Sequence, residues 1–159
     1  MESEVQEVEI VEGASRRIVG TAKSYTMETR TDIPNQWRAF FEAGYEIAEA
    51  TGDAMYGLSF SHDGQGGFRY GVGVEVTQAP KVMPDGCCEM HLSGGTHAVR
   101  RVFGPMTELP GQMDWMFCDW LPGSGFELRE GAVFERYPHD ARNTPEVMAY
   151  ELWLPVREA

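Results

Sequence analysis

The fold is decided by the stretch IPNQWRAFF at residues 33–41, because LPGQMDWMF at residues 109–117 repeats its pattern. The two stretches are offset by 76 positions (109 minus 33), and in both a proline precedes apolar residues at helical spacing. Each stretch therefore predicts a helix that packs its apolar stripe against a sheet. Two copies of one pattern within 159 residues predict an internal duplication.

Two β-like runs follow each predicted helix. They span residues 55–60 and 68–76 in the first half and residues 133–137 and 149–156 in the second. The sequence therefore predicts one α+β domain, with a mostly antiparallel sheet and both helices on one face. Two similar halves, at about residues 4–78 and 86–157, are expected to meet across a pseudo-twofold seam, where ligand clefts often form.

Further strands are expected at the start of each half. They span residues 5–11 and 15–21 ahead of the first helix, and residues 87–92 and 96–103 ahead of the second. Because Ser93-Gly94-Gly95 is a tight-turn signal, the last two of these strands are predicted to form a hairpin.

Composition limits the classes of function. Thirteen basic and twenty-five acidic side chains give a formal charge of −12, which opposes binding to nucleic acid but permits attraction of cations or contact with a basic protein surface. No apolar stretch approaches the roughly 20 residues of a membrane span. The acidic N-terminus lacks the features of a signal peptide, so we expect a cytoplasmic protein without membrane association.

Cysteine and histidine do not predict a metal site. Cys87, Cys88 and Cys118 contain no CxxC spacing, and the four histidines match no zinc pattern. We therefore expect reduced thiols, no metal and no cofactor.

The last two strands carry the candidate site. Period-2 alternation puts Glu135 on one face with Tyr137, and Glu151 on one face with Trp153. The strands of the first half carry small residues at alternating positions, among them Gly71 and Gly73. Small residues across from large ones leave a cavity, and aromatic walls with carboxylates suit a flat or cationic molecule.

A second interpretation needs no ligand. A glutamate between apolar neighbours on an antiparallel strand is ordinary on a solvated face. In that case Glu151 is expected to pair with an arginine such as Arg69 or Arg136.

Several motifs together resemble one family. They are FRYGVGVEV at 68–76, LSGGTHAV at 92–99, Trp115 and Trp120 on the second helix, FERY at 134–137 and YELWLPV at 150–156. In this order they are similar to the GyrI-like effector-binding domain. That domain is found at the C-terminus of some AraC- and MerR-type transcription regulators and alone in the bacterial DNA gyrase inhibitor protein.

The resemblance implies duplicated β-α-β-β modules that form a curved sheet with a central groove for hydrophobic, often cationic, compounds. In multidrug-sensing members, acidic residues on the last two strands contact the positive charge of the ligand, and the matching residues are Glu135 and Glu151. The aromatic groove residues correspond to Tyr137 and Trp153. His97 departs from the pattern, because the family often has tyrosine at this place.

Three functions stay open on the sequence alone. The first is binding of a hydrophobic, cationic or aromatic compound, for sensing or sequestration. The second, implied by the resemblance, is hydrolysis of cyclopropane-containing cytotoxic compounds with Glu135 or Glu151 as the catalytic group. The third is inhibition of DNA gyrase by an acidic protein surface. A regulator or DNA gyrase is a possible protein partner, and the chain is expected to be a monomer or a homodimer.

Overall fold

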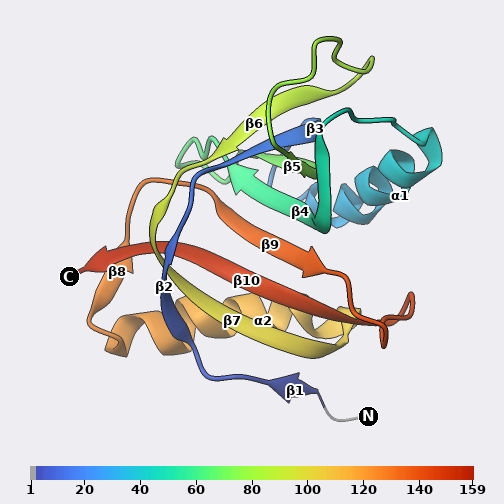
Figure 1. The fold of residues 1–159 in the computed structure, drawn as a ribbon. Coiled ribbons are helices and arrows are strands. Elements are labelled where there is room, and N and C mark those ends of the chain that lie inside the picture. The colour runs from blue at the N-terminus through green and yellow to red at the C-terminus, as the bar shows by residue number, and fades with distance from the viewer. Residues whose placement is uncertain (1–2) are drawn as a thin grey trace.

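The computed structural model describes residues 3–159 as one ten-stranded antiparallel sheet with two helices packed on one face (Figure 1). The strands follow the order β1-β7-β10-β9-β4-β5-β3-β6, with β2 also on β7 and β8 also on β10. This arrangement confirms the predicted α+β class. Within the described residues, no helix combines the length and the apolar character needed to cross a membrane.

Each half contributes three central strands. Those of the first half are β3 (Arg16–Tyr25), β4 (Ala50–Phe60) and β5 (Phe68–Val76), and those of the second half are β7 (Gly95–Pro105), β9 (Val133–Pro138) and β10 (Val147–Glu158). The halves meet where β4 pairs with β9. The order β3-β5-β4 on one side of this seam is repeated as β7-β10-β9 on the other, so the predicted duplication is confirmed.

Both helices begin where the sequence match places them. α1 spans Ile33–Ala43 and α2 spans Leu109–Trp115, each with its proline in the first turn, where a missing N–H breaks no helical bond. α1 ends at Gly44, whose φ of 61° is the left-handed conformation that glycine adopts readily. α2 is shorter than expected, because it passes directly into a π-helical turn. The flanking turns are η1 (Arg30–Asp32), η2 (Met106–Glu108), the π-helical η3 (Met116–Trp120) and η4 (Leu121–Gly123).

The predicted hairpin at residues 87–103 is wrong. β6 (Cys88–Leu92) pairs with β3 of the first half, whereas β2 (Glu9–Gly13) pairs with β7 of the second half. The β2–β3 and β6–β7 connections cross at close range, where a Cβ on Gly94 would come within 2.8 Å of the Ser15 backbone nitrogen. Each half thus gives an edge strand to the other, and we call this the strand exchange.

Two short strands complete the sheet. β1 (Glu4–Val5) lies on β7, and β8 (Phe126–Leu128) lies on β10. The single strand expected at residues 5–11 is therefore divided between β1 and β2.

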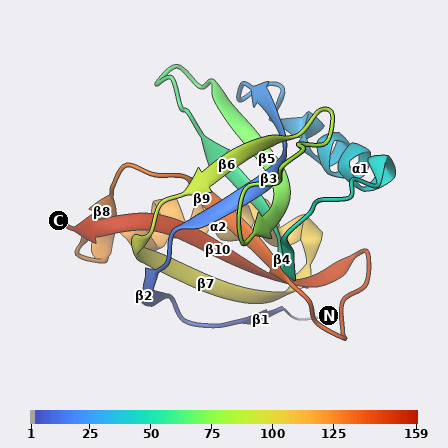
Figure 2. The same ribbon diagram turned by 45° about the horizontal axis from the view of Figure 1, so that its top comes forward.

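The two faces of the sheet bury different cores. On the helix face, β3 and β5 pack against α1, and β7 and β10 pack against α2. On the other face, Ile18 of β3 and Val99 of β7 belong to one buried cluster although their strands are far apart in the sheet. Such packing requires the sheet to curl over this face, and Figure 2 shows β3 and β6 passing over β9 and β10. We call this the inner face.

Candidate functional site

The two glutamates predicted to share a groove lie on opposite faces of the sheet. Glu135 is paired across the strands with Gly57 and with Leu152, and Leu152 packs under α2. Glu151 is paired with Arg136. Because directly paired residues of antiparallel strands point the same way, Glu135 lies on the helix face and Glu151 on the inner face.

The error lies in the relative register of two strands. Alternation within one strand correctly groups Glu135 with Tyr137 and Glu151 with Trp153, but it does not say which faces of different strands coincide. The expectation of one groove walled by both pairs is therefore wrong. Ligand binding by either pair stays a prediction.

Glu135 is held by two tyrosine hydroxyls beneath α1. Tyr70 donates a hydrogen bond of 2.7 Å and Tyr137 one of 3.3 Å to the same carboxylate oxygen. Trp37 of α1 covers both rings, because its Nε1 donates to the Tyr70 hydroxyl at 3.1 Å and its ring meets Tyr137 edge-on at 5.1 Å. We call these four residues the Glu135 cluster.

No cation within residues 3–159 pairs with the Glu135 carboxylate, although only 7% of the residue is exposed. Burial raises the pKa of this carboxyl to about 7, against the lowering effect of the two tyrosine hydrogen bonds. Burial and then the charge of Glu135 raise the pKa values of Tyr70 and Tyr137 well above the usual tyrosine range. Near neutral pH the cluster therefore holds a carboxyl divided between its neutral and charged forms.

Glu151 is compensated by arginine side chains. Arg101 and Arg136 each lie 3.4 Å from its Oε2, and Trp153 donates its Nε1 hydrogen to Oε1 at 3.0 Å. The expected pairing with Arg136 is thus confirmed. Arg136 also donates to the Tyr56 hydroxyl at 3.1 Å, so this inner-face network crosses the seam from β10 to β4.

Trp153 belongs to the inner core. Its ring stacks on Phe134 with 5.2 Å between centroids and an interplanar angle of 17°, and it lies 5.5 Å from the ring of His97. His97 is buried, and burial lowers the pKa of its imidazole, so the ring is neutral near pH 7. These three rings pack together on the inner face of β7, β9 and β10.

The predicted glycines serve packing on the inner face. A Cβ on Gly71 would collide with a side chain of β6, and a Cβ on Gly73 would collide with the backbone of β3, so both allow the sheet to curl tightly. Gly57 is the glycine that faces Glu135. The Tyr70 hydroxyl occupies the space above it, which places this oxygen within reach of the carboxylate.

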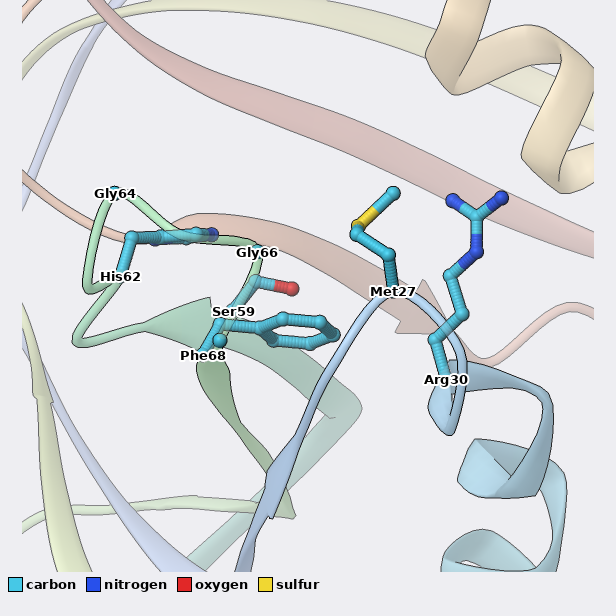
Figure 3. Close-up of a pocket in the computed structure, with 8 residues that line it drawn as sticks. Met27, Arg30, Ser59, His62, Gly64, Gly66 and Phe68 are labelled. Atoms are coloured by element: carbon cyan, nitrogen blue, oxygen red, sulfur yellow. The ribbon is translucent and has the colours of Figure 1, made fainter.

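A hollow of about 260 Å³ opens on the helix face between the segment before α1 and the β4–β5 hairpin (Figure 3). Met27 and Arg30, from the segment before α1, form one wall, and Ser59 and Phe68, from the β4–β5 hairpin, form the other. We call this the α1 hollow. One of its lining residues, Ser59, is paired across the strands with Tyr70 of the Glu135 cluster, but no residue of the cluster itself lines the hollow.

A larger hollow, of about 970 Å³, lies on the inner face. Leu58, Phe60 and Met90 give it an apolar floor, and Arg69 and Glu89 are among its charged residues. None of the six predicted site residues lines either hollow. Among residues 3–159, no three His, Cys, Asp or Glu side chains gather in a metal-binding arrangement.

Sequence reasoning missed two members of the Glu135 cluster. The strand pattern places Tyr70 among apolar core residues, and the helical stripe does the same for Trp37. The signal that could have found them is chemical: each ring carries a polar hydrogen that needs an acceptor when it is buried.

Solved structures with this fold cover almost the whole chain. An integron cassette protein from Vibrio cholerae is 17% identical, with a TM-score of 0.74, and the match covers 99% of this chain and 100% of that one. SAV2435 bound to tetraphenylphosphonium is 16% identical, with a TM-score of 0.79 and coverage of 96% and 94%. The C-terminal domain of EcmrR is 13% identical, with a TM-score of 0.64 and coverage of 100% of both chains. At such identities these likenesses show the fold alone.

The family is shown by a match of the sequence itself. No curated protein matches the chain significantly. The family model described as the GyrI-like small molecule binding domain, however, matches residues 6–157. The resemblance recognised from the motifs is therefore confirmed, and the chain belongs to the GyrI-like small molecule binding domain family.

Proposed function

We propose that this protein binds a cationic aromatic small molecule on the helix face, with Glu135 as the counter-charge. One observation carries the proposal: among residues 3–159 the buried carboxyl of Glu135 has no cationic partner, and the side chains that donate hydrogen bonds to it are Tyr70 and Tyr137.

A cation relieves the electrostatic cost of this arrangement. Burying a carboxylate without a positive partner costs several kcal/mol, and Glu135 avoids part of that cost by taking up a proton near neutral pH. A bound cation replaces the proton and stabilises the charged form. Glu151 does not offer the same gain, because Arg101 and Arg136 already balance its charge.

The aromatic walls suit a guest that carries rings. The rings of Trp37 and Tyr137 lie beside the carboxyl, so a cation that pairs with Glu135 meets aromatic surfaces. At about 260 Å³ the α1 hollow is smaller than the roughly 300–1,000 Å³ of drug-sized sites, and no residue of the Glu135 cluster lines it. A guest that reaches Glu135 therefore has to displace side chains that cover the carboxyl, such as Trp37.

Two broader observations support a cationic ligand. The formal charge of −12 favours the approach of cations from solution. SAV2435, which shares the fold, has been solved with tetraphenylphosphonium, a cation with four aromatic rings.

Calorimetric titration with tetraphenylphosphonium at pH 8, where Glu135 is ionised, tests the proposal. We expect Glu135→Gln to weaken binding at least tenfold, because an amide cannot neutralise the cation. The control is Glu151→Gln, which removes a carboxylate of the same size from the inner face and should change affinity less than twofold. Thermal unfolding verifies that both variants are folded. Equal affinities of wild type and Glu135→Gln would overturn the proposal.

Hydrolysis of a cyclopropane ring is a second candidate, favoured by the same carboxyl. A glutamate with a pKa of about 7 beside two phenolic hydroxyls is suited to general acid–base catalysis. Ionised Glu135 would take a proton from water as the water oxygen bonds to a ring carbon, the ring C–C bond breaks, and the Tyr137 hydroxyl protonates the departing carbon. The proton on Glu135 would then pass to the Tyr137 oxygen through their hydrogen bond, which restores both groups.

Chromatographic analysis of a cyclopropane-containing electrophile incubated with the protein tests this chemistry. Protein-dependent product that is lost in Glu135→Gln and reduced in Tyr137→Phe is the expected result. Equal product with and without protein would exclude hydrolysis and leave the binding proposal intact.

A further inference from the structure

Arg100 lies under α2 much as Glu135 lies under α1. On β10, Leu152 is paired with Glu135 on one side and with Arg100 on the other, so all three side chains point to the helix face. The guanidinium carbon of Arg100 lies 3.6 Å from the centre of a Trp115 ring on α2. The helix face therefore carries one charged group of each sign, the buried Glu135 carboxyl under α1 and the half-buried Arg100 guanidinium under α2.

Two donor atoms of Arg100 lack acceptors among the described residues. Its Nε and Nη1 atoms are buried and make no hydrogen bond to any described residue, and the same holds for the hydroxyl of neighbouring Tyr150. Arg129, by contrast, donates to several backbone carbonyls, and Arg136 donates to a hydroxyl and a carboxylate. A buried donor without an acceptor costs about 1–3 kcal/mol, and more when it is charged. An acceptor supplied by a ligand would remove this cost at three atoms.

The surroundings leave both groups able to donate. Burial lowers the pKa of Arg100 from its usual high value, while the neighbouring Tyr150 acts in the opposite direction. Burial, and after it the charge of Glu108, raise the pKa of Tyr150 to about 12, so its hydroxyl keeps its proton at neutral pH. Glu108 accepts a hydrogen bond from Ser3 and forms no ion pair with Arg100 within the described residues.

We propose that Arg100, Tyr150 and Trp115 form a subsite that binds the carboxylate of a flat aromatic acid. The guanidinium and the hydroxyl supply donors to the carboxylate, and the indole of Trp115 offers a surface on which an aromatic ring stacks. The π-helical turn begins at the next residue, Met116, and such turns are frequent at functional sites. The observations that carry this proposal are separate from those that carry cation binding at Glu135.

Benzoate is the probe, and benzyl alcohol, which has the same ring without the charge, is the matched control. At constant ionic strength we expect benzoate to raise the midpoint of thermal unfolding of the wild-type protein in proportion to its occupancy. It should also shift the Arg100 Nε–H and Trp115 indole N–H resonances in ¹H–¹⁵N spectra. Benzyl alcohol should do neither.

Variants locate the effect. Arg100→Met should weaken benzoate binding at least tenfold and Tyr150→Phe several-fold, with Arg100→Lys as the substitute if the methionine variant does not fold. Arg142→Met is the control, because Arg142 also stacks on a ring, that of Phe103 at 3.9 Å, but is exposed and ion-paired. The proposal is overturned if benzoate leaves the wild-type midpoint and both resonances unchanged, or if Arg100→Met binds as tightly as wild type.

Discussion

Glu135 and Arg100 face the same side of the sheet with only Leu152 between them, and they do not form an ion pair with each other. Neighbouring strands lie about 4.8 Å apart, so the two backbones are separated by roughly 10 Å. Opposite charges at this distance attract by about 1–2 kcal/mol at an effective dielectric constant near 20. Each charge therefore contributes to the electrostatic potential at the other proposed site.

This spacing predicts positive coupling between the two proposed sites. A cation in the Glu135 cluster cancels the repulsion between Glu135 and a carboxylate at the Arg100 subsite, so benzoate should bind up to about tenfold more tightly. Saturating tetraphenylphosphonium should raise the affinity for benzoate by the same factor by which saturating benzoate raises the affinity for tetraphenylphosphonium. Glu135→Gln should abolish the coupling, and additive binding in the wild-type protein would contradict it.

Replacing Glu135 by glutamine should stabilise the protein at alkaline pH. Because the folded-state pKa of about 7 lies above the ordinary glutamate pKa of 4.5, the folded protein binds more protons than the unfolded chain between these pH values, and its stability falls as pH rises. The full loss is ~3 kcal/mol above pH 7. Glu135→Gln should therefore raise the free energy of unfolding by about 1–3 kcal/mol at pH 8 and by little at pH 4.5. Urea unfolding across this pH range measures the difference, and parallel pH profiles for the two proteins would refute the prediction.

Replacing Glu151 by glutamine should destabilise the protein, in contrast to the same replacement at Glu135. Glu151→Gln leaves Arg101 and Arg136 without their shared counter-charge, so it should lower the free energy of unfolding at pH 7 by about 2–4 kcal/mol. Glu127→Gln is the control, since its pair with Arg157 is exposed and should contribute less than about 1 kcal/mol. Equal effects of the two substitutions in urea unfolding would show that the inner-face network does not depend on Glu151.

Removing the indole that covers the Glu135 cluster should shift the glutamate's titration. Trp37→Ala takes away the bond to Tyr70 and the contact with Tyr137, so water reaches the carboxyl and its pKa should fall from about 7 toward 4.5. Carbon-13 NMR titration of the carboxyl measures this value. Trp120→Ala removes a tryptophan that stacks on Phe126 in the second half and should leave the titration unchanged. An unaltered pKa in Trp37→Ala would show that the indole does not shield the site.

The sequence predicted the parts of the fold that depend on local pattern. The match between residues 33–41 and 109–117 was enough to place both helix starts and to predict two related halves. The sequence pattern did not reveal that Leu152, rather than Glu151, is paired with Glu135. The register between two strands is set by long-range packing, and a shift of one residue moves every side chain of a strand to the other face of the sheet.

The Ser-Gly-Gly segment shows a second limit of local pattern. A glycine-rich segment between two strands is typical of a hairpin, but Gly94 is required here because the chain passes close to Ser15. Local pattern also fails for Tyr70 and Trp37 at the candidate site. Both residues fit an apolar pattern, and only the fold reveals the hydrogen-bond partners of their polar atoms.

The strand exchange ties the folding of the two halves together. Ile10 pairs with Ala98, and Ile18 pairs with Met90, so the edges of both half-sheets are completed by residues more than 70 positions away (98 minus 10, and 90 minus 18). Contacts between residues so far apart in the sequence form slowly, and neither half can complete its part of the sheet by itself. Unfolding should therefore be a single cooperative event. A change in stability at one proposed binding site should then change the stability of the whole domain.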